Sequence, residues 1–470
     1  MMKFLFIQKN AFPLVGIMSL SAVIKKCGWQ VDLVLAGEED IFNKINNFKP
    51  DIVGFCVFTG EHKWVLEQAK IIEKKYPKII LLVGGPHPTY YPDIINEKGI
   101  DGLIRGEAEG AIQDLICALD NNKSITKIKN LWFKKGKKIY KNSLRPLITN
   151  LDSLPAPDRK IYYQYSFLKN ASVKQFLTGR GCPYDCSFCS NHILKKIYKG
   201  KGQYVRRYSP KRIIEEIKEI KSNYGFRIIS FTDDLFIYDK IWLKKFLKIY
   251  KKEINVPFMC NVTANSLSDE IAKMLKKGGC YGIAMGVETG NENMRLRILN
   301  KNISNEQIIN CGRIARKYQL ELKTYNIFCL PGETFDQALE TLKLNIRLKP
   351  SGAAASLLQP YPDYDITNYA IKNGYLKKDY NIEDVNESIY LPSVIKNKDS
   401  QRIANLQAFF PFLVAHPEFL PLIKPLLLLI NLRLSRFIAR LTYGYYLSHV
   451  HRLSFWDKVG YIRHIDPLKV

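Results

Sequence analysis

The sequence predicts an α/β protein with an N-terminal doubly wound Rossmann-like sheet, a partial (β/α)6 barrel and a mainly helical C-terminal region. Apolar runs of strand length alternate with helix-like segments of about 10 to 15 residues, which is typical of parallel sheets. A proline-containing connector, Leu151–Asp158, interrupts this alternation before it starts again. Beyond residue 409 the composition changes to long apolar stretches with arginines.

These changes divide the chain into four expected segments. Residues 1–145 should form the first sheet domain, 146–165 a linker, 166–365 the barrel and 366–470 the helical C-terminal region. A chain of 470 residues is long enough for two or three domains with sizeable cores.

In the first domain we expect helices at Gly16–Cys27 and His62–Lys75, and a hairpin from Leu131 to Tyr140. Ligands of such sheets bind beyond the carboxyl ends of the strands, so the residues that follow each strand are candidates for function. The expected strands are Phe4–Gln8, Val31–Ala36, Asp51–Thr59, Ile79–Gly85 and Gly102–Gly106.

In the barrel, Ser209-Pro210 and Ser304 have the residue types that begin helices. The expected strands are Lys174–Gly179, Arg227–Thr232, Phe258–Ala264, Gly282–Glu288, Leu322–Leu330 and Ala353–Tyr361. The expected helices are Pro210–Ser222, Ile241–Lys252, Ser268–Lys277, Ser304–Tyr318 and Phe335–Leu348.

The composition is that of a globular protein, with 46% hydrophobic and 24% charged residues. A formal charge of +27 is compatible with nucleic acid, an anionic membrane surface or acidic substrates, and equally with a general bias toward lysine. The lysines form no single basic block, so a nucleic-acid partner is not expected.

Ten scattered cysteines do not form the pattern of a disulfide scaffold, and the first residues lack the features of a secretion signal. We therefore expect a cytoplasmic protein.

Cys182, Cys186 and Cys189 form a C-x3-C-x2-C motif after a strand-like run. Three thiolates on one loop can bind three irons of a [4Fe–4S] cluster and leave the fourth iron open for another ligand. Structural zinc requires four closed ligands, and His192 is too near on the same loop to complete a good tetrahedron. A disulfide would leave one cysteine over.

This motif, with Phe188 directly before the third cysteine, resembles that of the radical S-adenosylmethionine (SAM) superfamily. The resemblance implies that SAM chelates the open iron and is cleaved to a 5′-deoxyadenosyl radical. An external electron donor of the flavodoxin or ferredoxin type is then expected.

Polar residues and glycines also follow three of the barrel strands, where singly each would be an ordinary strand-to-helix turn. Together they resemble the SAM-contacting segments of the superfamily. The resemblance implies Thr232 and Asp233 or Asp234 near the SAM amino group and Glu288 near the ribose or the methionine carboxylate. It also implies that Pro331, Gly332 and Glu333 lie near adenine.

In the first domain, glycine-rich loops follow the strands and let a backbone approach a large ligand. The segments G-G-P-H-P-T and G-E-A-E resemble the cobalamin-binding domain that precedes many radical SAM domains. A D-x-H-x-x-G element for a cobalt ligand is absent, so the expected role of His87 is turn packing rather than cobalt ligation. The residues implied as cobalamin contacts are Thr59, Gly84, Gly85, His87, Thr89, Gly106 and Glu107.

Residues 409–440 are strongly apolar and end with Arg433, Arg436 and Arg440 at helical spacing. Lys424 and two prolines interrupt the span, so a transmembrane helix is not expected. Two alternatives remain, a packed cover over the open side of the barrel or a peripheral membrane contact.

Taken together, the resemblance implies a cobalamin-dependent radical SAM methyltransferase. Its expected cofactors are a [4Fe–4S] cluster, SAM and cobalamin, and its substrate is expected to be an unactivated carbon of a small molecule or lipid. Alternatives are a cyclase or oxidoreductase with the same cofactors, a tRNA methylthiotransferase, or a non-catalytic sensor. A methylthiotransferase should hold a second cluster on three N-terminal cysteines, and Cys27, Cys56 and Cys117 match this poorly because Cys27 and Cys117 lie within helix-like segments.

Overall fold

The computed structural model describes residues 1–386, 391–431, 434, 435, 437–442 and 444. The chain divides into two compact units. We call residues 1–170 and 193–206 the N-terminal unit, and residues 171–192 and 207 onward the barrel unit.

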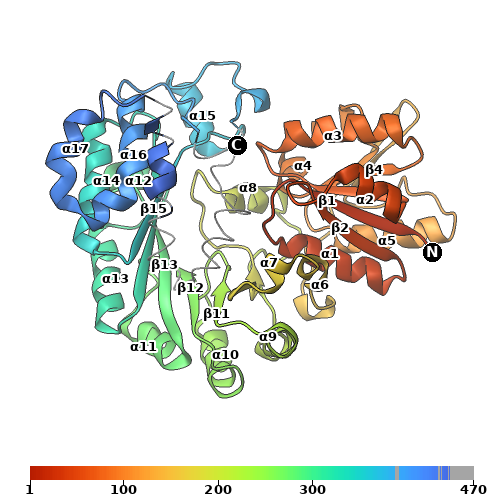
Figure 1. Ribbon diagram of the computed structural model, residues 1–470, viewed down its shortest axis with the longest axis horizontal. Coiled ribbons are helices and arrows are strands. Elements are labelled where there is room, and N and C mark those ends of the chain that lie inside the picture. Colours follow the sequence, from red (N-terminus) through yellow and green to blue (C-terminus); the bar gives the residue numbers. More distant parts are fainter. Residues whose placement is uncertain (387–390, 432–433, 436, 443, 445–470) are drawn as a thin grey trace. The chain divides into compact units, whose positions relative to one another are not determined.

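The N-terminal unit is built on a seven-stranded sheet of order β2-β1-β3-β4-β5-β6-β7 (Figure 1). Its strands are β1 (Lys3–Gln8), β2 (Gln30–Leu35), β3 (Ile52–Cys56), β4 (Ile80–Gly84), β5 (Gly102–Ile104), β6 (Leu131–Lys135) and β7 (Lys138–Lys141). Its helices are α1 (Val15–Lys26), α2 (Ile41–Phe48), α3 (His62–Lys75), α4 (Pro86–Tyr90), η1 (Pro92–Asn96), α5 (Glu109–Asp120), η2 (Leu151–Ser153), α6 (Lys160–Tyr163) and α7 (Ser166–Lys169).

The first five strands are parallel, and β6 and β7 add the expected antiparallel hairpin. The order 2-1-3-4-5 reverses direction between β1 and β3, and this switch point is where such sheets bind ligands. Leu5, Val53 and Val83 from three strands pack with Val65 and Ile72 of α3 in one apolar core. The predicted doubly wound sheet is therefore confirmed.

The barrel unit contains a six-stranded parallel sheet of order β15-β14-β13-β12-β11-β8, with helices along its outer face (Figure 1). Its strands are β8 (Val173–Phe176), β11 (Ile228–Phe231), β12 (Phe258–Val262), β13 (Cys280–Glu288), β14 (Glu321–Phe328) and β15 (Gly352–Leu357), with short pieces β9 (Gly179–Arg180) and β10 (Arg206–Arg207). The helices are α8 (Ser190–Ile197), α9 (Pro210–Tyr224), α10 (Lys240–Glu253), α11 (Asp269–Gly278), α12 (Glu292–Arg297), α13 (Asn305–Lys317) and α14 (Phe335–Leu348).

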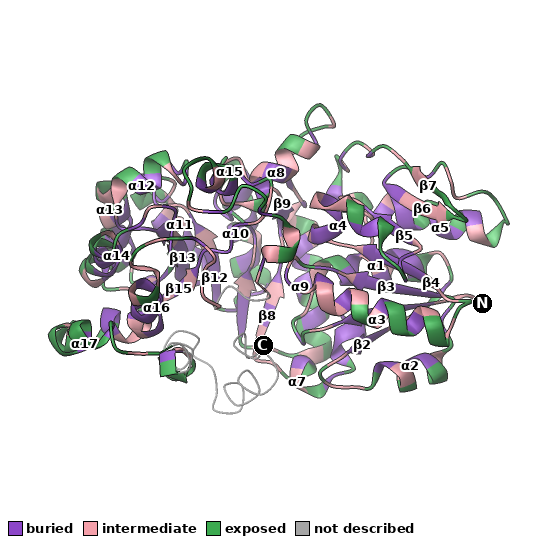
Figure 2. Ribbon diagram, turned by 90° about the horizontal axis from the view of Figure 1, so that it is seen from above, coloured by how far each residue is buried: buried purple, intermediate pink, exposed green. Residues whose placement is uncertain are grey.

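This sheet confirms the predicted partial barrel, because all six expected strands are present. The expected strand Lys174–Gly179 is shorter than predicted: β8 ends at Phe176, and Gly179 belongs to the separate piece β9. Ser209 and Ser304 cap α9 and α13, accepting hydrogen bonds from the backbone of Arg212 and Gln307. In Figure 2 the strands are buried while the surrounding helices expose their outer faces.

The C-terminal part of the barrel unit is helical, as predicted. It comprises α15 (Asp365–Lys372), η3 (Ile382–Asp384), α16 (Ser400–Ala415), η4 (Pro417–Phe419) and α17 (Leu420–Leu426). The helix α16 packs on β15 and α14, with Phe410 against Phe328 at 5.2 Å between ring centroids. In the described part of the chain, every helix is too short or too polar to cross a bilayer.

Candidate functional site

Cys182, Cys186 and Cys189 lie half-buried on the loop between β9 and α8. Hydrogen bonds hold this loop to the segment after α12. The backbone nitrogen of Ser187 donates to the carbonyl of Leu299 at 2.9 Å, and its hydroxyl donates to the carbonyl of Ile298 at 2.6 Å. The conformation of the cysteine loop is therefore set by contacts with distant sequence.

His192 ties the same loop to α15. Its Nδ1 lies 2.9 Å from the carboxylate of Asp185, which stands between two of the cysteines, and its Nε2 lies 2.8 Å from the carboxylate of Asp365. Both ring nitrogens are therefore engaged by acids. In this structure the residue considered as a zinc ligand instead bridges the cysteine loop to the start of α15.

The surroundings of the thiols disfavour their free anionic form. Burial raises the pKa of Cys186 to about 12, and the positive charge of Lys301 opposes this shift. Burial also raises the pKa of Cys189, while the amide of Asn191, 3.8 Å from its Sγ, lowers it. A bound cation must then replace the protons, as thiolate ligation of a metal requires.

Among the described residues, no three His, Cys, Asp or Glu side chains are placed to hold a single metal ion, as closed zinc sites require. A cluster sets a different requirement, because each thiolate binds its own iron. Three thiols on one short loop have the chemistry of that donor set, so the residues present fit a [4Fe–4S] cluster.

Glu288 ends β13 beside the cysteines, and its charge contributes to the raised pKa of both Cys186 and Cys189. Its carboxylate is 2.7 Å from Nζ of Lys301, which also donates to the carbonyl of Gly286 at 2.7 Å. Glu288 has a φ of 64°, which is unusual for a residue with a side chain. A Cβ on Gly286 would collide with the Glu288 carboxylate and the Lys301 ammonium, so a larger residue there would displace this ion pair.

The two neighbouring aspartates after β11 differ in how far their carboxylates are buried and already bound by other side chains. Asp233 is buried, and its carboxylate accepts hydrogen bonds from Arg207 at 2.9 Å and from the hydroxyl of Thr178 at 2.7 Å. Asp234 retains solvent contact, although crowding by protein atoms raises its pKa, and its charge acts on Cys189. Of the two aspartates, Asp234, which is also hydrogen-bonded to Asn191, is therefore the one whose carboxylate acts on the cysteine loop.

The loop after β14, which was predicted to contact SAM, is largely buried within the protein. Pro331 and Glu333 are buried, and the backbone nitrogen of Gly332 donates to the side chain of Asn397 at 3.0 Å. Burial raises the pKa of Glu333 to about 8. After β11, the half-buried Thr232 donates its backbone N–H to the carbonyl of Phe176 at 2.9 Å.

In the N-terminal unit, the predicted cobalamin contacts gather at the carboxyl ends of β3, β4 and β5. The hydroxyl of Thr59 lies 3.1 Å from Nδ1 of His87. The hydroxyl of Thr89 donates to the carbonyl of Gly85 at 2.8 Å and accepts from the backbone of Gly106 at 2.9 Å. Side chains thus join the three loops, and a Cβ on Gly84 would make only ordinary contact, 3.8 Å from the carbonyl oxygen of Ile104.

His87 is only 2% exposed, and its ring stacks on His62 with centroids 4.5 Å apart. Burial, with His62 nearby, lowers the pKa of His87 to about 3, so the ring is neutral. Glu107 is also committed within the unit, because its carboxylate binds Arg206 at 2.8 Å and the backbone of Ile148 at 3.0 Å. The side chains of His87 and Glu107 therefore stabilise the loops of the N-terminal unit.

Two aromatic residues at this edge were not among the predicted contacts. Phe12 follows β1 and Phe58 follows β3, and they are 37% and 39% exposed. Since β1 and β3 flank the switch point, the two rings offer apolar surface where such a sheet binds its ligand. The available signal was an aromatic residue two to four positions after the end of a buried strand.

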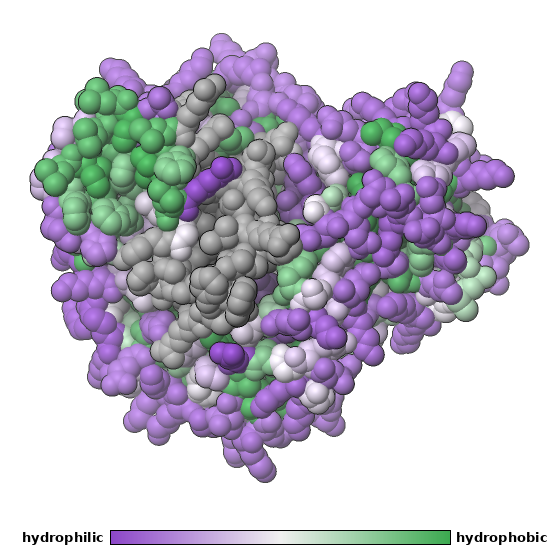
Figure 3. Space-filling model, in the orientation of Figure 1, coloured by the Kyte–Doolittle hydropathy of each residue, from purple (hydrophilic) through white to green (hydrophobic). Residues whose placement is uncertain are grey.

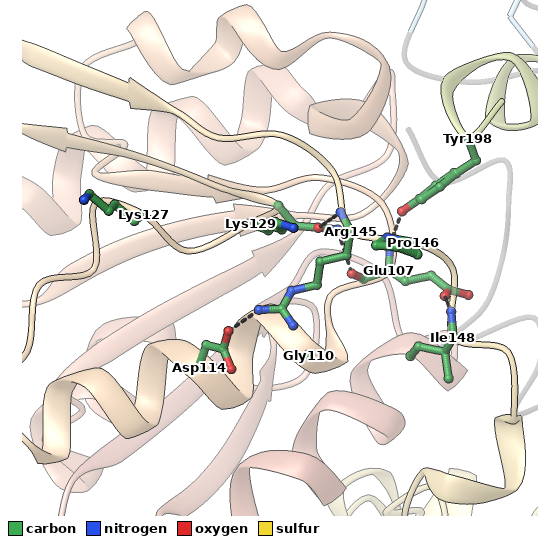
Figure 4. Close-up of a pocket in the computed structure, with 10 residues that line it drawn as sticks. Glu107, Gly110, Asp114, Lys127, Lys129, Arg145, Pro146, Ile148 and Tyr198 are labelled. Carbon is green, nitrogen blue, oxygen red and sulfur yellow. Dashed lines mark hydrogen bonds and ion pairs between the residues drawn. The ribbon is translucent and has the colours of Figure 1, made fainter. Parts of the chain in front are cut away.

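A separate pocket of about 540 Å³ lies between α5 and the segment 127–148 (Figure 4). Lys127, Lys129 and Arg145 line it, and Arg145 is paired with Asp114. It shares only Glu107 with the predicted cobalamin contacts. We do not assign this pocket to a cofactor.

Comparison with known families and proteins agrees with this geometry. The model of the radical SAM superfamily matches residues 176–344, and the model of the B12 binding domain matches residues 9–116.

Curated relatives include an uncharacterized methyltransferase of Pyrococcus horikoshii, 29% identical over 72% of this chain and 73% of its own length. An anaerobic magnesium-protoporphyrin IX monomethyl ester cyclase of Rubrivivax gelatinosus is 24% identical over 70% of this chain, and the match spans 60% of that protein.

Among solved structures, the fold is similar to that of the radical SAM methyltransferase TsrM from Kitasatospora setae. The TM-score is 0.66 with 16% identity, over 79% of this chain and 76% of TsrM. Residues 176–344 are thus a radical SAM domain, and residues 9–116 are a B12 binding domain. The cofactors of this chain are a [4Fe–4S] cluster, SAM and cobalamin.

Proposed function

We propose that this enzyme is a cobalamin-dependent radical SAM methyltransferase that acts on an unactivated carbon of a small-molecule or lipid substrate. The observation that supports this most is the combination of a three-cysteine loop beside Glu288 and Asp234 with a separate glycine-edged sheet in one chain. Relatives named as methyltransferases point the same way.

In this proposal Cys182, Cys186 and Cys189 bind three irons and leave the fourth for SAM. When bound, the cluster would supply the electron that cleaves SAM, and cobalamin would supply the methyl group. The enclosing contacts of Ser187 and His192 keep the loop in one conformation, which limits reorganisation at the site.

Asp234 is the aspartate that we assign to the SAM amino group, because Asp233 is already paired with Arg207. An ammonium group is best bound by an available carboxylate. Glu288, held by Lys301, would accept hydrogen bonds from the ribose hydroxyls. Thr232 and the segment 331–333 would border the nucleoside.

Cobalamin would lie on the glycine loops at Gly84, Gly85 and Gly106, with Phe12 and Phe58 against its flat ring. We do not assign His87 as a cobalt ligand, since its ring is buried against His62 and bonded to Thr59.

A cyclase with the same cofactors is the second candidate, and relatives named as magnesium-protoporphyrin ester cyclases favour it. The tRNA methylthiotransferase alternative needs three gathered cysteines in the N-terminal unit. Cys27 interacts electrostatically with Cys117, whereas the half-buried Cys56 interacts with Glu61 and with neither of these cysteines, so the three thiols do not form one group.

The test is turnover of SAM with a deuterated methyl group, under anaerobic conditions with a strong reductant and extracts of candidate substrates. A methyltransferase should form 5′-deoxyadenosine and S-adenosylhomocysteine and yield a product heavier by one labelled methyl group. Formation of 5′-deoxyadenosine with an unlabelled, oxidised or cyclised product would contradict methylation and favour the second candidate.

A further inference from the structure

The helix α17 and the residues after it expose several large apolar side chains. Leu422, Leu426, Leu428 and Leu429 are 67%, 48%, 66% and 79% exposed. We call these four residues the leucine surface. Figure 3 shows a continuous hydrophobic area over the C-terminal helices of the barrel unit. Exposed apolar area of this extent marks an interaction site.

The opposite side of the same segment is also apolar. Ile423 and Leu427 are buried and pack into the core formed by α16 and β15, which includes Phe410 and Leu413. A helix that buries one apolar side and exposes another does not follow the ordinary amphipathic pattern of a surface helix. The packing of Ile423 and Leu427 into this core therefore orients the leucine surface toward solvent.

Along the sequence, the charges from Phe419 onward are basic, although Glu418 directly precedes this stretch. From Phe419 to Trp456 the sequence contains no aspartate or glutamate. The same stretch contains Lys424, Arg433, Arg436, Arg440 and Arg452. Arg433, Arg436 and Arg452 lie outside the described residues, and they contribute here only as positive charges in the sequence.

The apolar exposure continues beyond α17. Leu434, Phe437 and Leu441 recur at helical spacing and are 47%, 58% and 59% exposed. Apolar side chains accompanied by basic ones are the features of a segment that lies in a membrane interface. Since no described helix is suited to crossing a bilayer, such a segment would rest on the surface.

We propose that the described residues 419–431 bind this enzyme to the surface of an anionic lipid bilayer, with the leucine surface entering the headgroup region. The basic residues would be attracted to the negative lipids. Binding is independent of the reaction that the enzyme catalyses, so the two proposals fail separately.

The experiment is sedimentation of the full-length protein with vesicles of phosphatidylcholine alone and of phosphatidylcholine mixed with phosphatidylglycerol. The double variant L428Q/L429Q removes the two outermost leucines of the leucine surface. The matched control is Ile241→Gln, which removes a 72% exposed apolar side chain from α10 of the same unit. Thermal unfolding checks that both variants fold like the wild type.

We expect the wild type and the control to bind the anionic vesicles, less so at high salt, and the double variant to bind about tenfold more weakly. Equal binding of the double variant and the wild type would overturn the proposal, as would absence of binding to anionic vesicles. A dimer that the double variant loses, without vesicle binding, would assign the surface to a second copy of the chain.

Discussion

The carboxyl ends of the two sheets carry opposite kinds of chemistry. In the barrel unit they present charge, with the carboxylate of Asp234 and the Glu288–Lys301 pair beside three thiols. In the N-terminal unit they carry glycines, two exposed phenylalanines and the buried, stacked rings of His62 and His87. In our proposal, the same parallel-sheet architecture binds the small charged ligand SAM in one unit and the large flat ligand cobalamin in the other.

The two edges also differ in the interactions that stabilise their conformation. The charged edge depends on ion pairs and on a strained backbone at Glu288, which must be held by its surroundings. The glycine edge depends on hydrogen bonds of Thr59 and Thr89 that join one loop to the next. Substitutions at the charged edge should therefore weaken the binding of a charged ligand. Substitutions at the glycine edge should instead alter the shape of the surface on which a ligand lies.

The largest expected effect is on stability and concerns Glu333. Its pKa is raised from 4.5 to about 8 by burial, so the folded protein binds this proton more tightly than the unfolded chain does. The resulting stabilisation is complete below about pH 4.5 and is lost as the pH rises through 8.

The variant Glu333→Gln cannot lose a proton, so its free energy of unfolding should exceed that of the wild type by about 4 kcal/mol at pH 8 and by little at pH 4.5. Urea unfolding at several pH values measures this. Glu306→Gln, on the exposed first turn of α13, is the control. An offset that does not change with pH would show that Glu333 is not held protonated.

The next effect tests whether charge at the barrel edge binds SAM. Glu288→Gln should weaken SAM binding by about 10- to 100-fold, because it removes a charged hydrogen-bond acceptor. Equilibrium dialysis of the reconstituted enzyme with labelled SAM measures this. Asp269→Asn, which breaks the exposed pair with Lys317, should leave binding unchanged. Unchanged affinity in Glu288→Gln would remove this residue from the site.

A smaller effect is expected at His192. Replacing it with Gln breaks at least one link between Asp185 and Asp365, and indirect ligand support of this kind is worth about tenfold in metal affinity. Iron release to a chelator should therefore be about tenfold faster. His416→Gln, which changes a histidine 3.3 Å from Glu418, is the matched control. Equal rates of iron release from the His192→Gln and His416→Gln variants would argue against a role of His192 in linking the cysteine loop to α15.

The smallest effect concerns the aromatic residues of the N-terminal unit. Phe58→Ala should weaken cobalamin binding about fivefold, as the loss of one aromatic contact of about 1 kcal/mol implies. Absorbance titration of the apoprotein with cobalamin measures it, with Tyr238→Ala, a 50% exposed ring of the barrel unit, as control. Weaker SAM binding instead would contradict the division of roles between the two sheets.

The sequence was sufficient to predict both sheets, because parallel strands are buried on both faces and appear in the sequence as short apolar runs. It could not choose between Asp233 and Asp234, since the choice depends on Arg207 lying against one of them. The partner of His192 is Asp365, which is 173 residues away. Contacts of this range have no local signal, and neither has the exposure of Leu428 and Leu429.

The most direct measurement is a count of iron and cobalt in protein purified and reconstituted without air, for the wild type and a C182A/C186A/C189A variant. The account predicts four irons and one cobalamin per chain in the wild type, and cobalamin without iron in the variant. SAM cleavage under a strong reductant should occur only in the wild type. Iron that persists in the triple variant, or a wild type that contains only zinc, would contradict the account.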